Sequence, residues 1–297
     1  MKRNALRQSR SDRAFDVVNH IIVILLMIVM FYPLYYVLVA SINNPVDTNS
    51  GKLVLFPSEF NVLGFRNVFK DSRILTGYAN SIFYTVCTTF LGLAMCIPCG
   101  YVLSRRDLVG RGFMTGFLVF TMYFSGGLIP TYTVVRSLHL TNSRLGIILL
   151  GSVSVYNIIL IRSYFRSSLP EELREAAEID GCSNLDFFFQ IALPLATPII
   201  AVIAMYIAEG MWNSYFNAMV YLTDIDKYPL QNFLREILLQ GEANTDLTDP
   251  ETAAERAYIM QMLKYCVIVL SSLPMMLLYP FIQRFFVTGL MIGSLKG

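Results

Sequence analysis

Cysteine and histidine are the residue types through which this sequence could bind a metal or carry out redox chemistry. Cys96 and Cys99 have the Cys-x-x-Cys spacing of a zinc or thiol–disulfide pair. Their neighbours are apolar, and a thiolate would be costly to bury there, so we interpret the pair as ordinary helix packing. The chain's 2 histidines, His20 and His139, exclude a histidine-rich metal site. We therefore expect no bound metal.

Nucleotide chemistry would require a phosphate-binding loop of the pattern G-x-x-x-x-G-K-[ST]. The chain contains no such pattern and cannot bind ATP by that route. A net charge of +2, without a basic stripe interleaved with aromatic residues, gives no indication of nucleic-acid binding. We expect neither a catalytic residue nor a cofactor in this chain.

The segment 165–191 has the residue spacing of two short helices joined by a turn. Ser168 followed by Glu171 has the pattern of a capping box at a helix start. Gly181 stands where a helix would end in the left-handed conformation that glycine favours. Ser183 can then cap a second helix. The segment is therefore predicted to form a helical hairpin.

The first helix of this hairpin carries an unusual concentration of acid. Ala176, Ala177 and Asp180 fall on or near one face, and small alanines allow close backbone approach. Carboxylates can accept charge-assisted hydrogen bonds from arginines of a partner protein. A solvated amphipathic hairpin without a partner is the alternative. The acids elsewhere on the helix are Glu171, Glu172, Glu175 and Glu178.

Apolar runs long enough to cross a membrane surround the hairpin. Charged residues make up 15% of the chain, against roughly 25% in a soluble domain. Runs of about 20 apolar residues predict membrane spans. We expect an all-α membrane protein of one transmembrane domain, 1–297, with six spans at about 17–40, 81–103, 113–134, 145–164, 192–215 and 265–285.

The distribution of Lys and Arg predicts the orientation of these spans. The run 17–40 follows a basic start but is longer than a signal-peptide core and contains Pro33, so we expect it to be retained. Lys and Arg are denser in the connecting segments on the same side of the membrane as the N-terminus than in the longer segments on the other side. This bias predicts that both termini and the hairpin lie in the cytoplasm.

Two long polar segments, about 41–77 and 220–262, are predicted to be outer loops that can touch a soluble partner. In the second, apolar residues recur at helical spacing directly behind Pro229, which suits the first turn of a helix. We expect this helix to lie flat on the membrane or against the bundle. Its apolar residues are Leu230, Phe233, Leu234, Ile237 and Leu238.

Glu209 is the one acid deep inside a predicted span, about 9 Å from the outer boundary. An ionisable group within the membrane should face the interior of the bundle. Glu209 therefore either lines a transport path or pairs with a neighbour. Four other polar residues could hydrogen-bond a sugar or a neighbouring helix: Asn80, Asn157, Asn213 and Tyr215.

Breaks in two spans are predicted by proline and glycine. Pro194 and Pro198 interrupt the inner end of the fifth span, and Gly126 and Gly127, with Pro130, loosen the third. Within lipid, irregular backbone is tolerated only where protein or a water-filled cavity covers it.

Several of these motifs together resemble a known family. Glu175-Ala176-Ala177, Gly181 four residues later, and Ile191-x-Leu193-Pro194 resemble the signature loop of permease subunits in binding-protein-dependent ABC importers. Further segments are similar to the maltose-type carbohydrate branch of that family: Phe124-Ser-Gly-Gly-Leu-Ile-Pro-Thr-Tyr132, Trp212-Asn213-x-Tyr215 and Gly289-x-x-x-Gly293-Ser-Leu-Lys-Gly297. The likeness is weakest in 41–77 and 240–260.

This resemblance implies a division of labour. Such a subunit pairs with a second permease, two ATP-binding subunits that hold ATP and Mg, and an extracytoplasmic solute-binding protein, in the lipid of a bacterial plasma membrane. The family's loop, here Glu175, Ala176, Ala177, Asp180, Gly181 and Pro194, couples the ATPase to the spans. The C-terminal tail, Lys296 and Gly297, reaches between the ATPase subunits. The expected cargo is an oligosaccharide or sugar derivative.

Two other functions remain open at the level of sequence. An ABC permease could carry an amino acid or a peptide instead of a sugar. A secondary transporter driven by an ion gradient is the second alternative, and the scarcity of ionisable residues within the spans argues against it.

Overall fold

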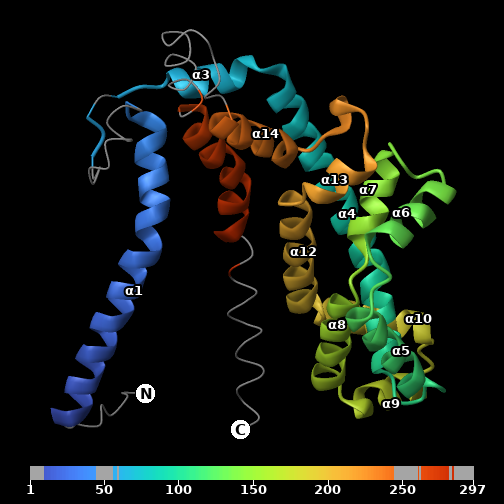
Figure 1. The fold of residues 1–297 in the computed structure, drawn as a ribbon. Helices are drawn as coiled ribbons and strands as arrows, with labels where there is room; N and C mark the ends of the chain where they lie inside the picture. The colour runs from blue at the N-terminus through green and yellow to red at the C-terminus, as the bar shows by residue number, and fades with distance from the viewer. Residues whose placement is uncertain are drawn as a thin grey trace. The chain divides into compact units, whose positions relative to one another are not determined.

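The structure is a computed structural model that describes residues 10–44, 56–58, 60–243, 260, 262–280 and 283 (Figure 1). All regular structure in these residues is helical, which confirms the predicted all-α class. The chain forms two compact units. The first comprises Met1–Lys70 and Ile237–Leu270, and the second comprises Asp71–Glu236 and Ser271–Gly297.

The first unit contains α1 (Arg10–Ile42), α3 (Leu63–Lys70) and the start of the helix Met262–Pro280. The apolar side chains of α1 are largely exposed, as expected for a helix that faces lipid. Near its end, the carbonyl oxygen of Ser41 accepts a hydrogen bond from Sγ of Cys266 at 3.3 Å. The predicted outer loop 41–77 contains a helix, α3.

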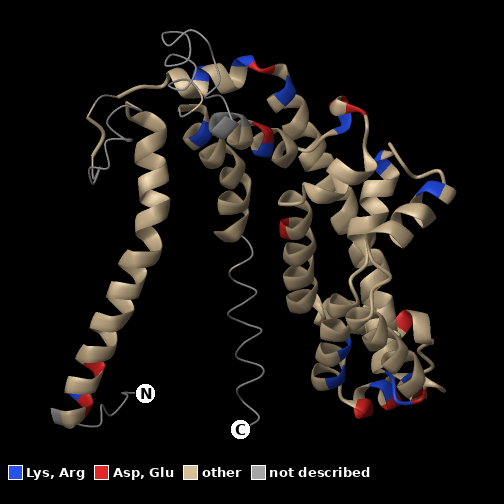
Figure 2. Cartoon of the chain, viewed as in Figure 1, with Lys and Arg blue, Asp and Glu red and all other residues tan. Residues whose placement is uncertain are grey.

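The second unit is built around α4 (Ser72–Ser104), which packs along α7 (Arg144–Ser152), α8 (Val155–Ser168) and α12 (Thr197–Trp212). Its charged residues gather toward the ends of these helices, and the middle is mainly uncharged (Figure 2). This distribution suits a bundle whose middle lies in the hydrocarbon core of a membrane.

Glycines on α4 allow the close packing of this bundle. A Cβ atom on Gly92 would lie 2.5 Å from the carbonyl oxygen of Ser152, and one on Gly100 would lie 2.5 Å from Cγ2 of Ile161. Both distances are shorter than a van der Waals contact, so these positions exclude any larger residue at the observed spacing.

Three helices of the described chain are long and apolar enough to cross a membrane, namely Ser11–Ile42, Ser72–Ser104 and Met262–Pro280. Three bent pairs raise the number to six if each pair is one span. The pairs are α5 (Arg111–Tyr123) with α6 (Leu128–Ser137), bent by 112°, α7 with α8, bent by 44°, and Asn184–Leu195 with α12, bent by 76°. Six spans with both termini inside therefore stay a prediction.

Two of the three bends occur where proline and glycine predict them. Gly127, with φ +87°, separates α5 from α6. Before α12, Pro198 has no amide hydrogen for the carbonyl of Pro194, and Oγ1 of Thr197 donates to that oxygen at 2.7 Å. The hydroxyl of Tyr164 donates to the next carbonyl, that of Leu195, at 3.1 Å. Side chains thus satisfy the oxygens that the break frees.

At the opposite end of the unit, α13 (Phe216–Tyr221) and the 3-10 turn Ile225–Lys227 lead into α14 (Leu230–Ala243). The predicted helix behind Pro229 is confirmed. Its first turns lie against α4, because Leu230 donates its amide hydrogen to Oγ of Ser81 at 2.9 Å and Leu230 is buried.

Candidate functional site

The predicted hairpin consists of α9 (Glu171–Ile179) and α10 (Asn184–Asp186), which continues into the π-helix η1 (Phe187–Ala192) and α11 (Leu193–Leu195). Gly181 has φ +80°, and the amide of Cys182 donates to the carbonyl of Ala177 at 2.9 Å, which closes the end of α9. Oγ of Ser183 accepts from the amide of Asp186 at 3.2 Å. The turn and the second cap are thus as predicted.

The predicted capping box at Ser168 is wrong. α8 continues through Ser168, and Pro170 occupies the N-cap position of α9 without a side-chain cap. Glu171, the expected partner of Ser168, instead forms an ion pair with Arg174. Proline fixes an extended backbone there, which starts the new helix without help from a hydroxyl group.

The residues of the signature motif point in two directions. Glu175, Ala176 and Asp180 are exposed, whereas Ala177 is buried against the second unit's core. Exposed apolar side chains extend the outer surface, and Ile179 is 86% exposed. The sequence reasoning missed Leu185 and Phe189, whose large side chains are also exposed. The hairpin therefore presents a mixed acidic and apolar surface.

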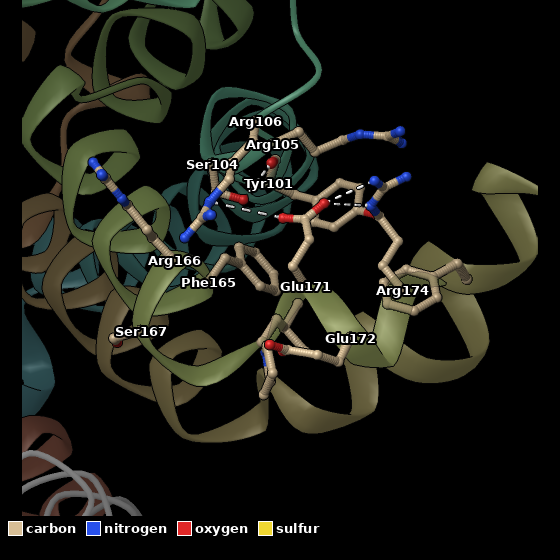
Figure 3. Close-up of a pocket in the computed structure, with 13 residues that line it drawn as sticks. Tyr101, Ser104, Arg105, Arg106, Phe165, Arg166, Ser167, Glu171, Glu172 and Arg174 are labelled. Carbon is tan, nitrogen blue, oxygen red and sulfur yellow. Dashed lines mark hydrogen bonds and ion pairs between the residues drawn. The ribbon is translucent and has the colours of Figure 1, made fainter. Parts of the chain in front are cut away.

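A cavity of about 220 Å³ lies behind the hairpin, where α4 and α8 end and α9 begins (Figure 3). Glu171 lies between two cations there. One of its carboxylate oxygens is 2.7 Å from Nη2 of Arg174, and the other is 3.9 Å from Nε of Arg106. Hydrogen bonding to Glu171 raises the pKa of Arg174. Glu171 thereby partly neutralises a lining that includes Arg105, Arg106, Arg166 and Arg174.

Arg105, the residue that ends α4, makes the most extensive polar contacts of this region. Its guanidinium donates to both carboxylate oxygens of Asp107, at 2.9 and 2.5 Å, and to Oδ1 of Asn184 at 2.7 Å. The hydrogen bond from Arg105 lowers the pKa of Asp107, and the same contact raises the pKa of Arg105. Both groups are therefore charged near neutral pH.

Aromatic rings join the same end of α4 to its neighbours. The ring of Tyr101 lies 5.3 Å from that of Phe165 on α8 and 4.9 Å from that of Phe188 in η1. Nε of Arg162 also donates to the carbonyl of Leu103 at 3.2 Å. The hairpin, α8 and the end of α4 thus meet at one packed junction.

A second cavity, of about 660 Å³, is lined by α7, α8, α12 and the residues that lead into α13. It brings together three of the predicted path residues, Glu209, Asn213 and Asn157. Sequence reasoning missed Asn217, which lies in α13, beyond the non-helical residues that follow α12. No Lys or Arg is among the described residues that line this cavity. The other polar lining residues are Ser154, Tyr156, Tyr206 and Ser214.

Asn80 and Tyr215 lie outside this cavity. The amide nitrogen of Asn80 donates to the carbonyls of Asp226 and Tyr228 at 2.7 and 3.0 Å, which holds the segment before α14 on α4. The ring of Tyr215 lies 5.5 Å from the guanidinium carbon of Arg235.

Pro194 lies in α11 at the bend before α12, and its ring is exposed. The predicted tail residues, Lys296 and Gly297, lie outside the described residues.

Comparison with known proteins agrees with this arrangement. Residues 5–290 match the family model described as "Binding-protein-dependent transport system inner membrane component". Protein LplC of Bacillus subtilis is 35% identical over 294 residues, which cover 99% of each chain. The polygalacturonan/rhamnogalacturonan transport system permease protein YtcP of the same organism is 36% identical, over 96% of this chain and 99% of its own.

A solved structure is also similar. A chain in the crystal structure of a bacterial ABC transporter involved in the import of the acidic polysaccharide alginate matches with a TM-score of 0.83. It is 33% identical, and the match covers 95% of this chain and 100% of that one.

Proposed function

Because the chain belongs to the family of inner-membrane components of binding-protein-dependent transport systems, we propose that it carries saccharides across the membrane as one subunit of an ATP-driven importer. The observation that carries this proposal is the similarity over nearly the whole chain to permeases of polysaccharide import. The cargo is an oligosaccharide or a sugar derivative, delivered by an extracytoplasmic solute-binding protein.

The complete importer contains this chain, a second permease and two ATP-binding subunits in a bacterial inner membrane. This chain crosses that membrane six times with both ends in the cytoplasm. ATP and Mg bind to the partner subunits, and this chain is not an enzyme. The three bent helix pairs support the larger number of spans, since each pair is long enough to cross only when its two halves are taken together.

The hairpin is the docking surface for the ATP-binding subunits. Its support is the exposure of Glu175, Ala176 and Asp180, beside a left-handed Gly181 that fixes the turn. Small and acidic residues suit insertion into a groove that offers cations. The tail residues Lys296 and Gly297 add a second contact with the same subunits.

The cavity around Glu209 forms this chain's half of the sugar path. Sugars offer many hydroxyl groups, and amide, hydroxyl and carboxylate side chains can each hydrogen-bond to them. Asn157, Asn213 and Asn217 supply amides within the same cavity as Glu209. A path role, rather than pairing with a cation, is favoured for Glu209 because no described lining residue carries positive charge.

The test is transport by the purified complex, with all its partner subunits, in proteoliposomes. We expect ATP-dependent uptake of labelled oligosaccharides, and an approximately tenfold loss in the Glu209→Lys variant because a cation would replace a hydrogen-bond acceptor in the path. Glu209→Gln, which keeps an acceptor, should lose less. Asp12→Lys, the same reversal of charge at an exposed position near the start of α1, is the control and should transport normally.

Three outcomes would contradict the proposal. Uptake of amino acids or peptides without uptake of saccharides would refute the cargo. Uptake that an ionophore abolishes but that needs no ATP would refute the ATP-driven mechanism. Equal uptake by Glu209→Lys and the unmodified complex would refute the path role of Glu209.

A further inference from the structure

The hairpin is connected to the rest of the second unit in two different ways. It continues covalently into α8 at one end and into α12, through η1 and α11, at the other. The end of α4, the helix at the centre of the unit, contacts the hairpin through side chains, among them Arg105 with Asn184 and Tyr101 with Phe188. A displacement of the hairpin therefore moves α8 and α12 through the chain itself. The end of α4 follows through its packing against those two helices and through its side-chain contacts with the hairpin.

Arg105 makes a polar contact that crosses from the end of α4 to the second half of the hairpin. Its bond to Asn184, at 2.7 Å, joins the first residue of α10 to the cap of α4. Within the described part of the chain, this hydrogen bond is the direct polar link between this end of α4 and α10. The Arg105 side chain is 16% exposed, which limits the access of competing water.

The geometry requires the fork of an arginine. Three separate N–H groups of Arg105 are used at once, two on Asp107 and one on Asn184. Asp107 therefore fixes the plane of the guanidinium so that its remaining edge faces Asn184. A lysine has the same charge but no planar fork, so it cannot make the three bonds in this arrangement.

We propose that Arg105 is a positioning residue that makes α4 follow the hairpin when the ATP-binding subunits move it. The inference rests on the proposed function, in which the hairpin docks on those subunits. α4 packs against α7, α8 and α12, the helices that line the cavity around Glu209. Movement of α4 therefore reaches the sugar path.

The neighbouring Arg106 provides a matched control. It has the same charge and the next position in the chain, yet its side chain is 73% exposed. Its ion pair with Glu171 is 3.9 Å long, much longer than the contacts of Arg105. If only positive charge at this end of α4 mattered, substitutions at the two positions would have equal effects.

The experiment measures the number of ATP molecules hydrolysed per sugar molecule taken up by the complete complex in proteoliposomes. We expect Arg105→Lys and Asn184→Ala each to raise this ratio roughly tenfold, through loss of a hydrogen bond to a charged group. Arg106→Lys and Asn184→Asp should leave the ratio within about twofold, because a carboxylate in place of the Asn184 amide would still accept from Arg105. The Arg105→Lys, Asn184→Ala double variant should be no worse than Arg105→Lys alone.

The outcomes separate this inference from the proposed function. Absence of ATP-dependent sugar uptake by the unmodified complex would overturn both. Normal uptake together with unchanged ratios in Arg105→Lys and Asn184→Ala would overturn the role of Arg105 only. If Arg105→Lys does not assemble, Asn184→Ala decides the question, because Asn184 is an exposed side chain whose truncation leaves no cavity.

Discussion

At the scale of single residues, the ion pairs of α9 divide its acidic side chains into two groups. Glu171 and Glu178 both form ion pairs with Arg174, so their charges are partly compensated within the chain. Glu175 is exposed on the same helix and forms no ion pair with any described residue. A partner protein can therefore bind its carboxylate without first breaking an internal ion pair.

Reversing the charge of Glu175 should uncouple ATP hydrolysis from sugar uptake. We expect Glu175→Lys to abolish sugar uptake in the assembled complex while the ATP-binding subunits still hydrolyse ATP, because like charges would then meet at the proposed docking surface. Glu175→Gln should give an intermediate loss. Uptake and hydrolysis are measured in parallel on complexes of verified composition. Unimpaired uptake by Glu175→Lys would rule out docking through this face.

Local residue patterns predicted the turn at Gly181 and the cap at Ser183, because both depend on the backbone within a few residues. The cap at Ser168 failed because Pro170, two residues later, sets the backbone direction by itself. The contacts of Asn80 could not be predicted, since its partners lie 64 to 148 residues away along the chain. Arg105 was missed for the same reason, with Asn184 79 residues away.

At the scale of helices, the packing of α4 against α7 and α8 requires glycine at positions 92 and 100, where those helices come closest. Proline and glycine foretold two of the three bends, but the bend between α7 and α8 falls at Val153 and Ser154, which are neither. The close approach of Ser152 to Gly92 accompanies that bend. Such a bend comes from packing between helices, which a single segment of sequence does not reveal.

Substitution of Gly92 should therefore be far more harmful than substitution of a glycine with free space. We expect Gly92→Ala to lower the free energy of unfolding by about 1–3 kcal/mol, and with it the melting temperature, because the new methyl group would overlap a backbone oxygen. The control is Gly116→Ala on α5, where a Cβ meets nothing within 4 Å. That variant should be neutral or slightly stabilised by helix propensity. Equal melting temperatures in detergent for both variants would contradict this account.

At the scale of the whole molecule, hydropathy located each long helix or bent pair, because a membrane selects for length and apolar composition before any detail of packing. The start of the second span differs, since α4 begins at Ser72 and the predicted run begins at 81. The polar residues Arg73, Thr76 and Asn80 hid that first part of the helix. Division into two compact units was not predicted, because it depends on which distant segments pack together.

The orientation can be tested with two exposed apolar positions at predicted opposite faces. In a variant without the 5 native cysteines, Leu138→Cys follows α6 on the predicted outer side and Val109→Cys precedes α5 on the inner side. An impermeant maleimide should label the first in intact cells and the second only after permeabilisation. The reverse pattern would invert the topology, and labelling of both from outside would exclude the proposed number of spans.

The side-chain hydroxyls at the break before α12 have a consequence for the energy of motion. In an unbroken helix, a change in bend would stretch or break backbone hydrogen bonds within lipid, where no water replaces them. Here Thr197 and Tyr164 already hold the two freed oxygens through rotatable O–H groups. Reorienting those hydroxyl groups can accommodate a new bend angle. The backbone hydrogen bonds at this break are already absent in the folded chain, so a change of angle here does not have to break them.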